Sequence, residues 1–283
     1  MPAPHAPGDP SKAWPAVSAA GAVSDLNWLG FCRRAARAAR EAVAAYSTTA
    51  ARGVETGRGE GGDVALVIDR AAEDAVFAEL DALGVGLTAI SEERGEVALG
   101  GGGPVRVVID PVDGSLNAKR GLPFACVSIA VASGAAMDDV DVAYVAELAP
   151  PLDWWAVRGQ GAFRAGERLP PLEPGRLELL GLETAHPRLV AEAAQAIASI
   201  EAKRVRALGS VATTLCLVAA GRLDAMLSLR PVRSVDAAAA QLIVREAGGT
   251  VAFPEGSSLD LAMRSRVLAA RDPALLERLL AVF

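Results

Sequence analysis

The segment DPVDGSLN, residues 110–117, directly follows the largely apolar run VRVVI at residues 105–109. A short apolar run rich in valine and isoleucine is typical of a buried strand. Proline restricts the residue before it to an extended backbone, so Asp110 is expected to continue the strand. Pro111 and Gly114 favour a tight turn just beyond it. The sequence therefore predicts a strand that ends in an acidic turn.

This turn combines two kinds of polar group. The carboxylates of Asp110 and Asp113 and the carbonyl oxygen of Val112 are hard oxygen ligands, which Mg²⁺ and Ca²⁺ prefer. The backbone N–H groups of Gly114 and Ser115 lie where a helix is expected to start, and such groups bind anions. An ordinary surface turn is the alternative, because Asp-Pro and Asp-Gly are common turn pairs. A combined metal and phosphate site is the hypothesis that the rest of the chain must support.

Further acidic residues stand at the ends of other apolar segments. Glu92 and Glu93 follow the predicted strand at residues 86–90, and Asp69 and Asp236 each open a predicted helix. Side chains at strand ends meet at one edge of an α/β sheet, where ligands commonly bind. Gathering carboxylates costs free energy through repulsion and desolvation unless a cation compensates. Because histidine and cysteine are absent from this set, magnesium, manganese or calcium is favoured over zinc.

Helix patterns precede a strand-rich region, and strands and helices alternate in the second half of the chain, which indicates an α/β (α+β) class of fold. Helices are predicted over residues 24–46, with Ser24 or Asp25 as N-cap, and over 69–83, 187–200, 209–221, 236–249 and from 273 onward. The region between 86 and 163 is predicted to be rich in strands and to end in a hairpin. The glycine-rich stretch at 53–63 is predicted to be a mobile loop.

The organisation predicted from these patterns has three parts. Residues 1–23 contain five prolines and lack the basic start and apolar centre of a signal peptide, so they are predicted to form a disordered tail. An N-terminal α+β domain over residues 24–150 is expected to carry the acidic motifs. A C-terminal α/β domain over residues 151–283 follows, with the boundary near the Pro150-Pro151 pair.

Composition excludes several classes of protein. The 283 residues carry 28 basic and 34 acidic side chains, a net charge of −6 that disfavours nucleic-acid binding. The chain has no apolar run long enough to span a membrane. The three cysteines, Cys32, Cys126 and Cys216, are widely spaced and odd in number. We expect them to be buried and reduced in a cytoplasmic protein.

Five segments in order, from about Asp63 to Gly249, resemble the inositol monophosphatase and fructose-1,6-bisphosphatase superfamily. They are GGDVALVIDRAAED, SEE, DPVDGSLN, RALGSVATTLCLVAAGRLDA and VDAAAAQLIVREAGG. The resemblance implies a layered αβαβα sandwich, two or three Mg²⁺ ions per site, and a homodimer. It also implies hydrolysis of a phosphate monoester by in-line attack of water, with no phosphoenzyme.

The resemblance also implies roles for particular residues. One Mg²⁺ is expected on Glu92, Asp110 and the Val112 carbonyl, and a second on Asp110, Asp113 and Asp236. Asp69, Glu92 and Ser115 are the candidate catalytic residues, with Asp69 and Ser115 activating the water near a weaker third ion. Substrate contacts are expected from the Gly114 and Ser115 amides and from Gly209, Ser210 and Arg230.

Departures from the family pattern bear on the substrate. Val235 stands where the family has Trp, and residues 227–230 lack the acid that contacts the cyclitol in inositol-specific members. These features are similar to archaeal-type members that hydrolyse both inositol phosphate and fructose 1,6-bisphosphate. The candidate partners for a second phosphate are Arg230, Arg233, Lys119 and Arg120. The expected substrate is therefore a small sugar or cyclitol phosphate, most simply inositol monophosphate. A 3′-phosphoadenosine nucleotide, histidinol phosphate and a non-catalytic role are the alternatives.

Overall fold

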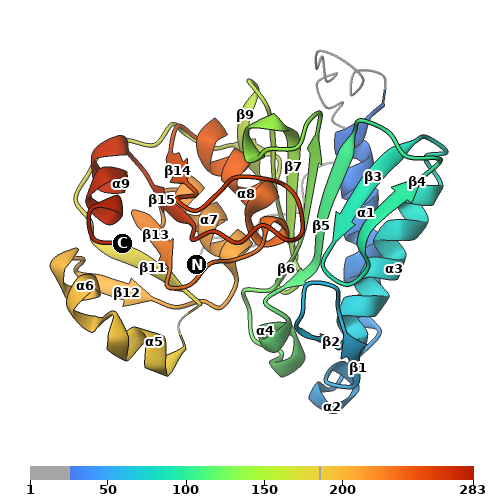
Figure 1. Ribbon diagram of the computed structural model, residues 1–283, viewed down its shortest axis with the longest axis horizontal. Coiled ribbons are helices and arrows are strands. Elements are labelled where there is room, and N and C mark those ends of the chain that lie inside the picture. Colours follow the sequence, from blue (N-terminus) through green and yellow to red (C-terminus); the bar gives the residue numbers. More distant parts are fainter. Residues whose placement is uncertain (1–25, 185) are drawn as a thin grey trace, which may run out of the picture.

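The computed structural model describes residues 26–184 and 186–283 (Figure 1). The predicted tail at 1–23 lies outside the described residues. Helices and two sheets alternate in layers: helices α1 and α3, an eight-stranded sheet, helices α7 and α8, a five-stranded sheet, and an outer group of helices α5, α6 and α9. The predicted αβαβα sandwich is confirmed.

Helices α1 (Trp28–Ala44) and α3 (Val67–Asp81) cover the outer face of the large sheet. Residues Leu29, Cys32, Ala36 and Val43 of α1 are buried, and their spacing of three, four and seven residues places them on one face. The side chain of Asn27 accepts a hydrogen bond from the Gly30 N–H at 2.8 Å and caps the helix. The helix therefore begins at Trp28, later than predicted, and the expected caps Ser24 and Asp25 lie outside the described residues.

The large sheet has the strand order β10-β9-β8-β7-β6-β5-β3-β4. Its strands are β3 (Leu87–Ser91), β4 (Gly95–Leu99), β5 (Arg106–Asp113), β6 (Cys126–Ala132), β7 (Val140–Glu147), β8 (Leu152–Val157), β9 (Gly161–Arg164) and β10 (Glu167–Arg168). Neighbours are antiparallel except β3 and β5, which run parallel with Ser91 paired to Ile109. The residues that follow this pair, Glu92 and Asp110, are thereby placed side by side.

The two sheets separate later than the predicted domain boundary. Strands β8, β9 and β10 pair with one another and with β7, so the large sheet continues to Arg168. The Pro150-Pro151 pair, where the boundary was expected, lies in the short connection between β7 and β8. The first strand of the second sheet, β11, begins at Leu179. The proline pair marks a tight turn within one sheet, which a sequence pattern does not distinguish from a linker.

The second sheet has the order β12-β11-β13-β15-β14 and comprises β11 (Leu179–Glu183), β12 (Arg204–Arg206), β13 (Ala225–Ser228), β14 (Thr250–Ala252) and β15 (Leu268–Ala270). Helices α7 (Val211–Ala219) and α8 (Ser234–Glu246) lie between the sheets. Residues 237–240 of α8 are four buried alanines. Small side chains on every face allow this helix to pack closely against both of its neighbouring layers.

The glycine-rich stretch predicted to be a loop contains a hairpin. Strands β1 (Glu55–Arg58) and β2 (Val64–Leu66) pair antiparallel, with Glu55 opposite Leu66. Every residue of β1 is exposed, so the strand lacks the apolar alternation that sequence reasoning depends on. Short helices α2 (Thr49–Arg52), α4 (Ser115–Arg120), α5 (Pro187–Glu192), α6 (Ala194–Ser199) and α9 (Pro273–Leu280) complete the fold.

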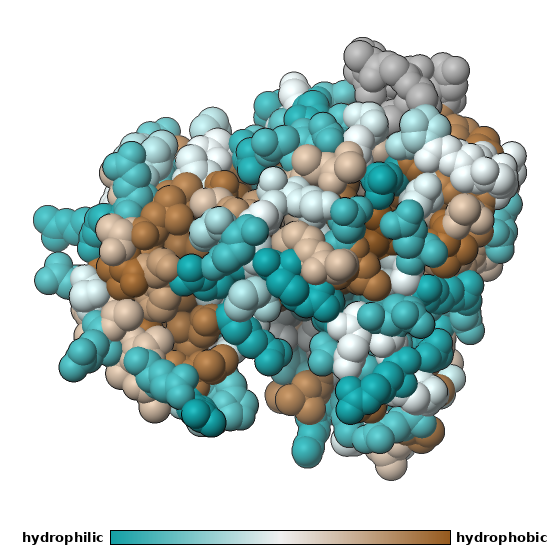
Figure 2. Space-filling model, in the orientation of Figure 1, coloured by the Kyte–Doolittle hydropathy of each residue, from teal (hydrophilic) through white to brown (hydrophobic). Residues whose placement is uncertain are grey.

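Besides the character of its surface, the structure bears on two predictions from the sequence: the lack of a membrane-spanning segment and the state of the cysteines. Figure 2 shows hydrophilic side chains over the middle of the visible face, between the two sheets. Among the described residues, no helix combines the length and the apolarity needed to cross a membrane. The three cysteines are buried and unpaired, as predicted.

Candidate active site

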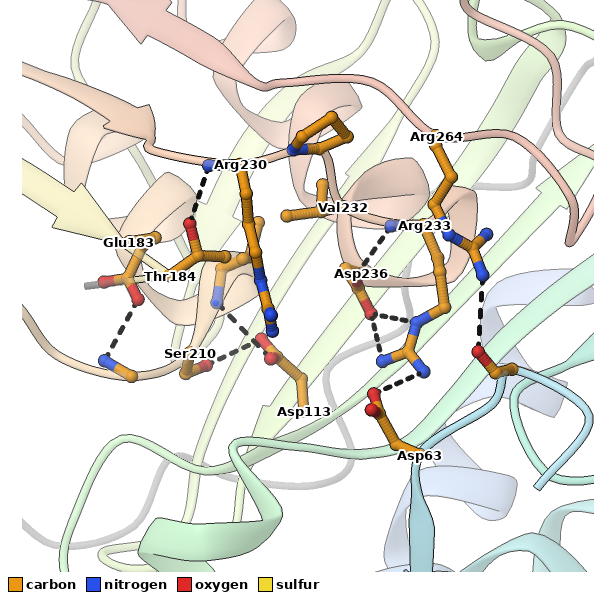
Figure 3. A pocket seen from close by; sticks show the side chains of 14 residues that line it. Asp63, Asp113, Glu183, Thr184, Ser210, Arg230, Val232, Arg233, Asp236 and Arg264 are labelled. Carbon is orange, nitrogen blue, oxygen red and sulfur yellow. Dashed lines mark hydrogen bonds and ion pairs between the residues drawn. The ribbon is translucent and has the colours of Figure 1, made fainter. Parts of the chain in front are cut away.

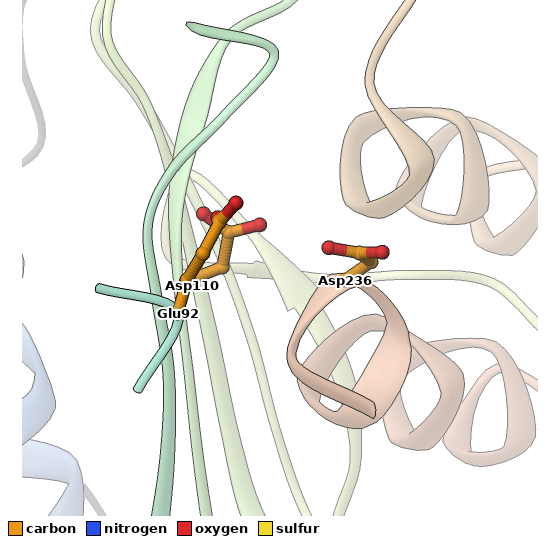
Figure 4. Close-up of side chains that lie close together, drawn as sticks. All are labelled: Glu92, Asp110 and Asp236. Carbon is orange, nitrogen blue, oxygen red and sulfur yellow. The ribbon is translucent and has the colours of Figure 1, made fainter. Parts of the chain in front are cut away.

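Three carboxylates converge where the large sheet meets α8 (Figure 4). Glu92 follows β3, Asp110 lies on β5, and Asp236 lies in the first turn of α8. Each offers an oxygen, and these oxygens lie within 4.8 Å of one another. The parallel pairing of β3 with β5 supplies two of the carboxylates, and α8 brings the third from the opposite side. The structure thus brings together three predicted metal ligands that lie far apart in the sequence.

Burial strongly affects the ionisation of this acidic cluster of Glu92, Asp110 and Asp236. Asp110 is 1% exposed and Asp236 is 8% exposed. Burial raises the pKa of Glu92 to about 8, with Arg233 opposing the shift and Asp236 adding to it. Burial, together with Glu92 and the other nearby carboxylates, raises the pKa of Asp110 well above its usual value. A hard divalent cation among these oxygens would offset both effects.

Arg233 faces two carboxylates of the cluster, and Figure 3 shows its pairing with Asp236 and with Asp63. Its Nη1 lies 2.5 Å from Glu92 Oε1 and 3.1 Å from Asp63 Oδ2. Its Nη2 lies 3.1 Å from Asp236 Oδ1, and its side chain is 14% exposed. Sequence reasoning considered Arg233 only as a partner for substrate phosphate. It missed this pairing because Glu92 and Arg233 come from opposite halves of the chain.

Asp113 is turned away from the cluster toward the start of α7. Its Oδ2 accepts hydrogen bonds from Ser210 Oγ and from the Ala212 N–H, both at 2.7 Å. Its Oδ1 accepts a longer bond of 3.3 Å from the Val211 N–H. Burial, followed by the neighbouring Asp236 charge, raises the pKa of Asp113 to about 7. The carboxylate therefore joins the two halves of the molecule across the site.

Asp69 and the DPVDGSLN turn complete the large-sheet side of the site. Asp69 is 3% exposed, and its Oδ2 accepts a hydrogen bond from the Leu66 N–H at 2.8 Å. Its Oδ1 is buried with no hydrogen-bond partner among the described residues. Burial raises the pKa of Asp69 to about 6. In the turn, Ser115 Oγ donates to the Val112 carbonyl oxygen at 2.8 Å, so these two predicted site groups contact each other.

A pocket of about 440 Å³ opens beside the cluster. Of the predicted substrate residues, Gly209, Ser210 and Arg230 line it. The Gly209 N–H donates to Glu183 Oε2 at 3.0 Å, and the Ser210 hydroxyl is directed at Asp113. These polar groups of Gly209 and Ser210 therefore bond to residues of the pocket wall and stabilise it. Arg230 is exposed, and its side chain extends across the pocket in Figure 3.

Glu183 is a further pocket residue that sequence reasoning missed. It is 2% exposed, ends β11, and accepts hydrogen bonds from the Leu208 N–H, the Gly209 N–H and the Thr214 hydroxyl. These bonds fix the loop that leads into α7. The sequence pattern could have identified Glu183, because it is an acid at the end of an apolar strand, as Asp110 is.

Gly114 requires a left-handed backbone, and we expect its replacement by alanine to destabilise the fold. Its φ is +88°, and a Cβ there would lie 2.6 Å from the Phe124 carbonyl oxygen. Strain and this close contact together should lower the free energy of unfolding by about 2–4 kcal/mol. Gly84→Ala is the matched control, because its φ is +65° with nothing within 4 Å of the added Cβ. Urea unfolding of both variants checks this, and equal losses would contradict the role of the Phe124 contact.

The chain is similar to known proteins over most of its length. The inositol monophosphatase family, as a family model, matches residues 27–283. A fructose-1,6-bisphosphatase/inositol-1-monophosphatase of Methanothermobacter thermautotrophicus is 33% identical over 267 residues, which cover 89% of this chain and 95% of that protein. The Nus factor SuhB of Escherichia coli is 34% identical over 261 residues, with 89% and 94% covered. The crystal structure of the extragenic suppressor protein suhB from Bartonella henselae matches with a TM-score of 0.76 and 27% identity, and covers 91% of this chain and 98% of that one. These similarities confirm the resemblance drawn from the five segments, and the chain is a phosphatase of the inositol monophosphatase family.

Proposed function

We propose that this chain is a Mg²⁺-dependent phosphomonoesterase whose substrate is a small sugar or cyclitol phosphate. The observation that carries the proposal is the convergence of Glu92, Asp110 and Asp236 within 4.8 Å beside an arginine-lined pocket. Three buried carboxylates at this separation supply the hard oxygen ligands of a divalent cation. The adjacent arginines suit the negative charge of a phosphate ester.

The residues present fit the proposed ions. Glu92, Asp110 and the Val112 carbonyl would hold one Mg²⁺, and Asp110, Asp113 and Asp236 a second. For Asp113 the available atom is Oδ1, because Oδ2 already accepts two bonds of 2.7 Å from the start of α7. When bound, Mg²⁺ supplies charge neutralisation of the phosphate and a lowered pKa of the attacking water.

The chain's own residues would bind the phosphate and handle the proton. The backbone N–H groups of Gly114 and Ser115 would hold the phosphate at the start of α4. Asp69 Oδ1 would accept the proton of the attacking water, because this buried oxygen has no other partner among the described residues. The Ser115 hydroxyl, now bonded to the Val112 carbonyl, would orient that water once the carbonyl binds a cation.

The side chains that line the pocket also suit a substrate with more negative charge than inositol monophosphate. Leu229 and Arg230 stand in the region where inositol-specific members carry an acid. Arg230 extends into the pocket, so a second phosphate would find a guanidinium partner there. The Methanothermobacter thermautotrophicus relative, 95% of whose length aligns with this chain, carries both names, fructose-1,6-bisphosphatase and inositol-1-monophosphatase. We therefore propose inositol monophosphate as one substrate and fructose 1,6-bisphosphate as a second.

Phosphate release from a small substrate panel tests the proposal. The panel holds inositol 1-phosphate, fructose 1,6-bisphosphate, 3′-phosphoadenosine 5′-phosphate and histidinol phosphate, each with Mg²⁺ and with EDTA. We expect Mg²⁺-dependent release from the first two. Turnover of only one of the last two would replace the proposed substrate class. No release from any of them while Mg²⁺ still binds would indicate a phosphate ester outside this panel or the non-catalytic alternative.

Two further proposals concern the assembly and the compartment of the protein. We propose that the protein is a homodimer. Size-exclusion chromatography with light scattering would test this by measuring the molar mass. We also propose a reducing, cytoplasmic compartment, because the three cysteines are buried and unpaired.

The stability contributed by Mg²⁺ is expected to grow as the pH rises. In the folded chain the pKa is about 6 for Asp69, about 7 for Asp113 and about 8 for Glu92, all above their ordinary values. The folded chain therefore holds protons that the unfolded chain has already lost, and the free energy of unfolding falls as the pH rises from about 4 through 8. Mg²⁺ replaces those protons, and protons compete with it at low pH.

Melting temperatures measured with Mg²⁺ and with EDTA check this expectation. The difference between the two should be larger at about pH 8 than at about pH 5.5, by on the order of 5 °C. NaCl at equal ionic strength in place of MgCl₂ is the control for screening. An equal or smaller Mg²⁺ effect at the higher pH would contradict the assignment of these carboxylates to the cation.

A further inference from the structure

We infer that the Arg233 guanidinium is the cation of the metal-free acidic cluster, so that a divalent ion binds there by exchange with it. The inference rests on the Mg²⁺ dependence proposed above. It adds a residue that sets the affinity for the ion and the stability of the metal-free enzyme. Arg233 precedes Asp236 by one helical turn, at the N-cap position of α8.

The hydrogen bonds of Asp236 show where a metal ion and Arg233 compete. Its Oδ1 accepts from Arg233 Nε at 3.3 Å and from Nη2 at 3.1 Å. Its Oδ2 accepts from the Arg233 backbone N–H at 2.8 Å. A carboxylate offers about four lone-pair positions, so Arg233 occupies about three of the four. A metal ion with ordinary coordination at Asp236 Oδ1 must therefore displace a guanidinium N–H.

The second carboxylate is held in the same way. Arg233 Nη1 lies 2.5 Å from Glu92 Oε1, and the two side chains are 14% and 12% exposed. A guanidinium keeps its charge throughout the accessible pH range, unlike a buried lysine. It therefore acts as a permanent counter-charge for Glu92 and Asp236, two carboxylates that would each help to hold a Mg²⁺ ion.

Asp63 gives the displaced guanidinium a second partner. Arg233 Nη1 also lies 3.1 Å from Asp63 Oδ2, and the Asp63 side chain is 73% exposed on the β1–β2 hairpin. Asp63 and Arg233 both line the pocket. After exchange, the guanidinium can keep its bond to Asp63 and face the pocket without leaving a buried charge unpaired. The exchange therefore costs less than breaking a fully buried ion pair.

The charge balance predicts two opposite effects of removing Arg233. Without the guanidinium, the metal-free protein holds three close carboxylates with no cation between them, and it should be less stable. The same loss removes the competitor of Mg²⁺, so the ion should bind more tightly. A residue that only supports the ligands would instead weaken metal binding when it is removed.

Calorimetric titration of the full metal-free chain with MgCl₂ tests the inference. Arg233→Gln should bind Mg²⁺ with a Kd lower than wild type by about tenfold, because no charge-assisted pair has to be broken. Its metal-free melting temperature should fall, and the rise on adding Mg²⁺ should exceed that of wild type. An unchanged or higher Kd would overturn the inference.

Arg264→Gln is the matched control. Arg264 lines the same pocket, but its guanidinium donates to the carbonyl oxygens of Leu261, Met263 and Gly61. Its replacement should leave the Kd for Mg²⁺ within about twofold of wild type, because no carboxylate of the cluster loses a partner. A decrease equal to that of Arg233→Gln would show a general effect of positive charge and would overturn the exchange.

A measurement on wild-type protein keeps the inference testable if Arg233→Gln does not fold. Crystals grown without metal and with Mn²⁺ should differ at the contact between Arg233 Nη1 and Glu92 Oε1, now 2.5 Å, which should open beyond ion-pair distance. An intact contact with Mn²⁺ bound to Glu92 and Asp236 would overturn the inference. Mg²⁺-dependent phosphate release together with an intact contact refutes only the exchange. Failure of wild type to bind either ion refutes the proposed metal dependence as well.

Discussion

Replacing Asp110 with asparagine is expected to abolish binding of Mg²⁺ at the acidic cluster and to lower kcat by about a thousandfold or more. Asp110 is the central carboxylate, 1% exposed, and both proposed ions would share it. Asparagine keeps the size of the side chain and an oxygen that can accept the Val112 N–H, which Asp110 Oδ1 accepts at 3.0 Å. The turn should therefore survive while the charge is lost.

Calorimetric titration with MgCl₂ and steady-state phosphate release measure the two effects of Asp110→Asn. Asp224→Asn is the matched control, because Asp224 is also a buried carboxylate. Asp224 pairs with Arg271 at 2.6 Å and accepts hydrogen bonds from the Glu178 and Leu179 N–H groups at the start of β11, away from the cluster. The control should melt at a lower temperature, yet its folded form should keep normal kcat. Near-normal turnover by Asp110→Asn at limiting Mg²⁺ would remove Asp110 from the mechanism.

The acidic cluster was largely predictable from the sequence, for an identifiable physical reason. Asp110 and Glu92 each follow a short apolar run, and runs of this kind form neighbouring strands in one sheet. The structure adds the parallel register that pairs Ser91 with Ile109. Asp236 was recognisable as an acid in the first turn of a helix. Local patterns therefore specified which backbone segments end in carboxylates, and the sheet brings those ends together.

The partners of these carboxylates were not predictable in the same way. The ion pair of Arg233 with Glu92 and the bonds from Ser210 to Asp113 join residues from opposite halves of the chain. Such contacts depend on how the two sheets pack around α7 and α8, and no periodicity in the sequence encodes that. The hydrogen bonds of Gly209 and Ser210 were unpredictable for the same reason. Their positions in the pocket were predicted, but their bonds to Glu183 and Asp113 were not.

Replacing Asp69 with asparagine is expected to lower kcat by about a hundredfold or more and to leave the affinity of the main cluster for Mg²⁺ within a few fold. Asp69 lies on α3, outside the group of Glu92, Asp110 and Asp236. Its proposed role is to accept the proton of the attacking water, for which an amide is too weak a base. The Leu66 N–H, 2.8 Å from Asp69 Oδ2, can bond equally well to the asparagine oxygen. This variant should thus separate proton transfer from metal binding, which Asp110→Asn cannot do.

Glu73→Gln is the matched control for Asp69→Asn, because Glu73 is a buried carboxylate one turn later on the same helix. Glu73 accepts a hydrogen bond from Ser91 Oγ at 2.5 Å and pairs with Arg94 at 3.2 Å, so it supports the end of β3. Its replacement should lower the melting temperature while kcat stays within a few fold. If both variants lose kcat equally, the cause is distortion of β3 and of Glu92, and Asp69 is not the base. If only Asp69→Asn loses kcat while calorimetry shows normal Mg²⁺ binding, the missing function is the proton acceptor, since the fold, the cluster and the neighbouring carboxylate are all retained.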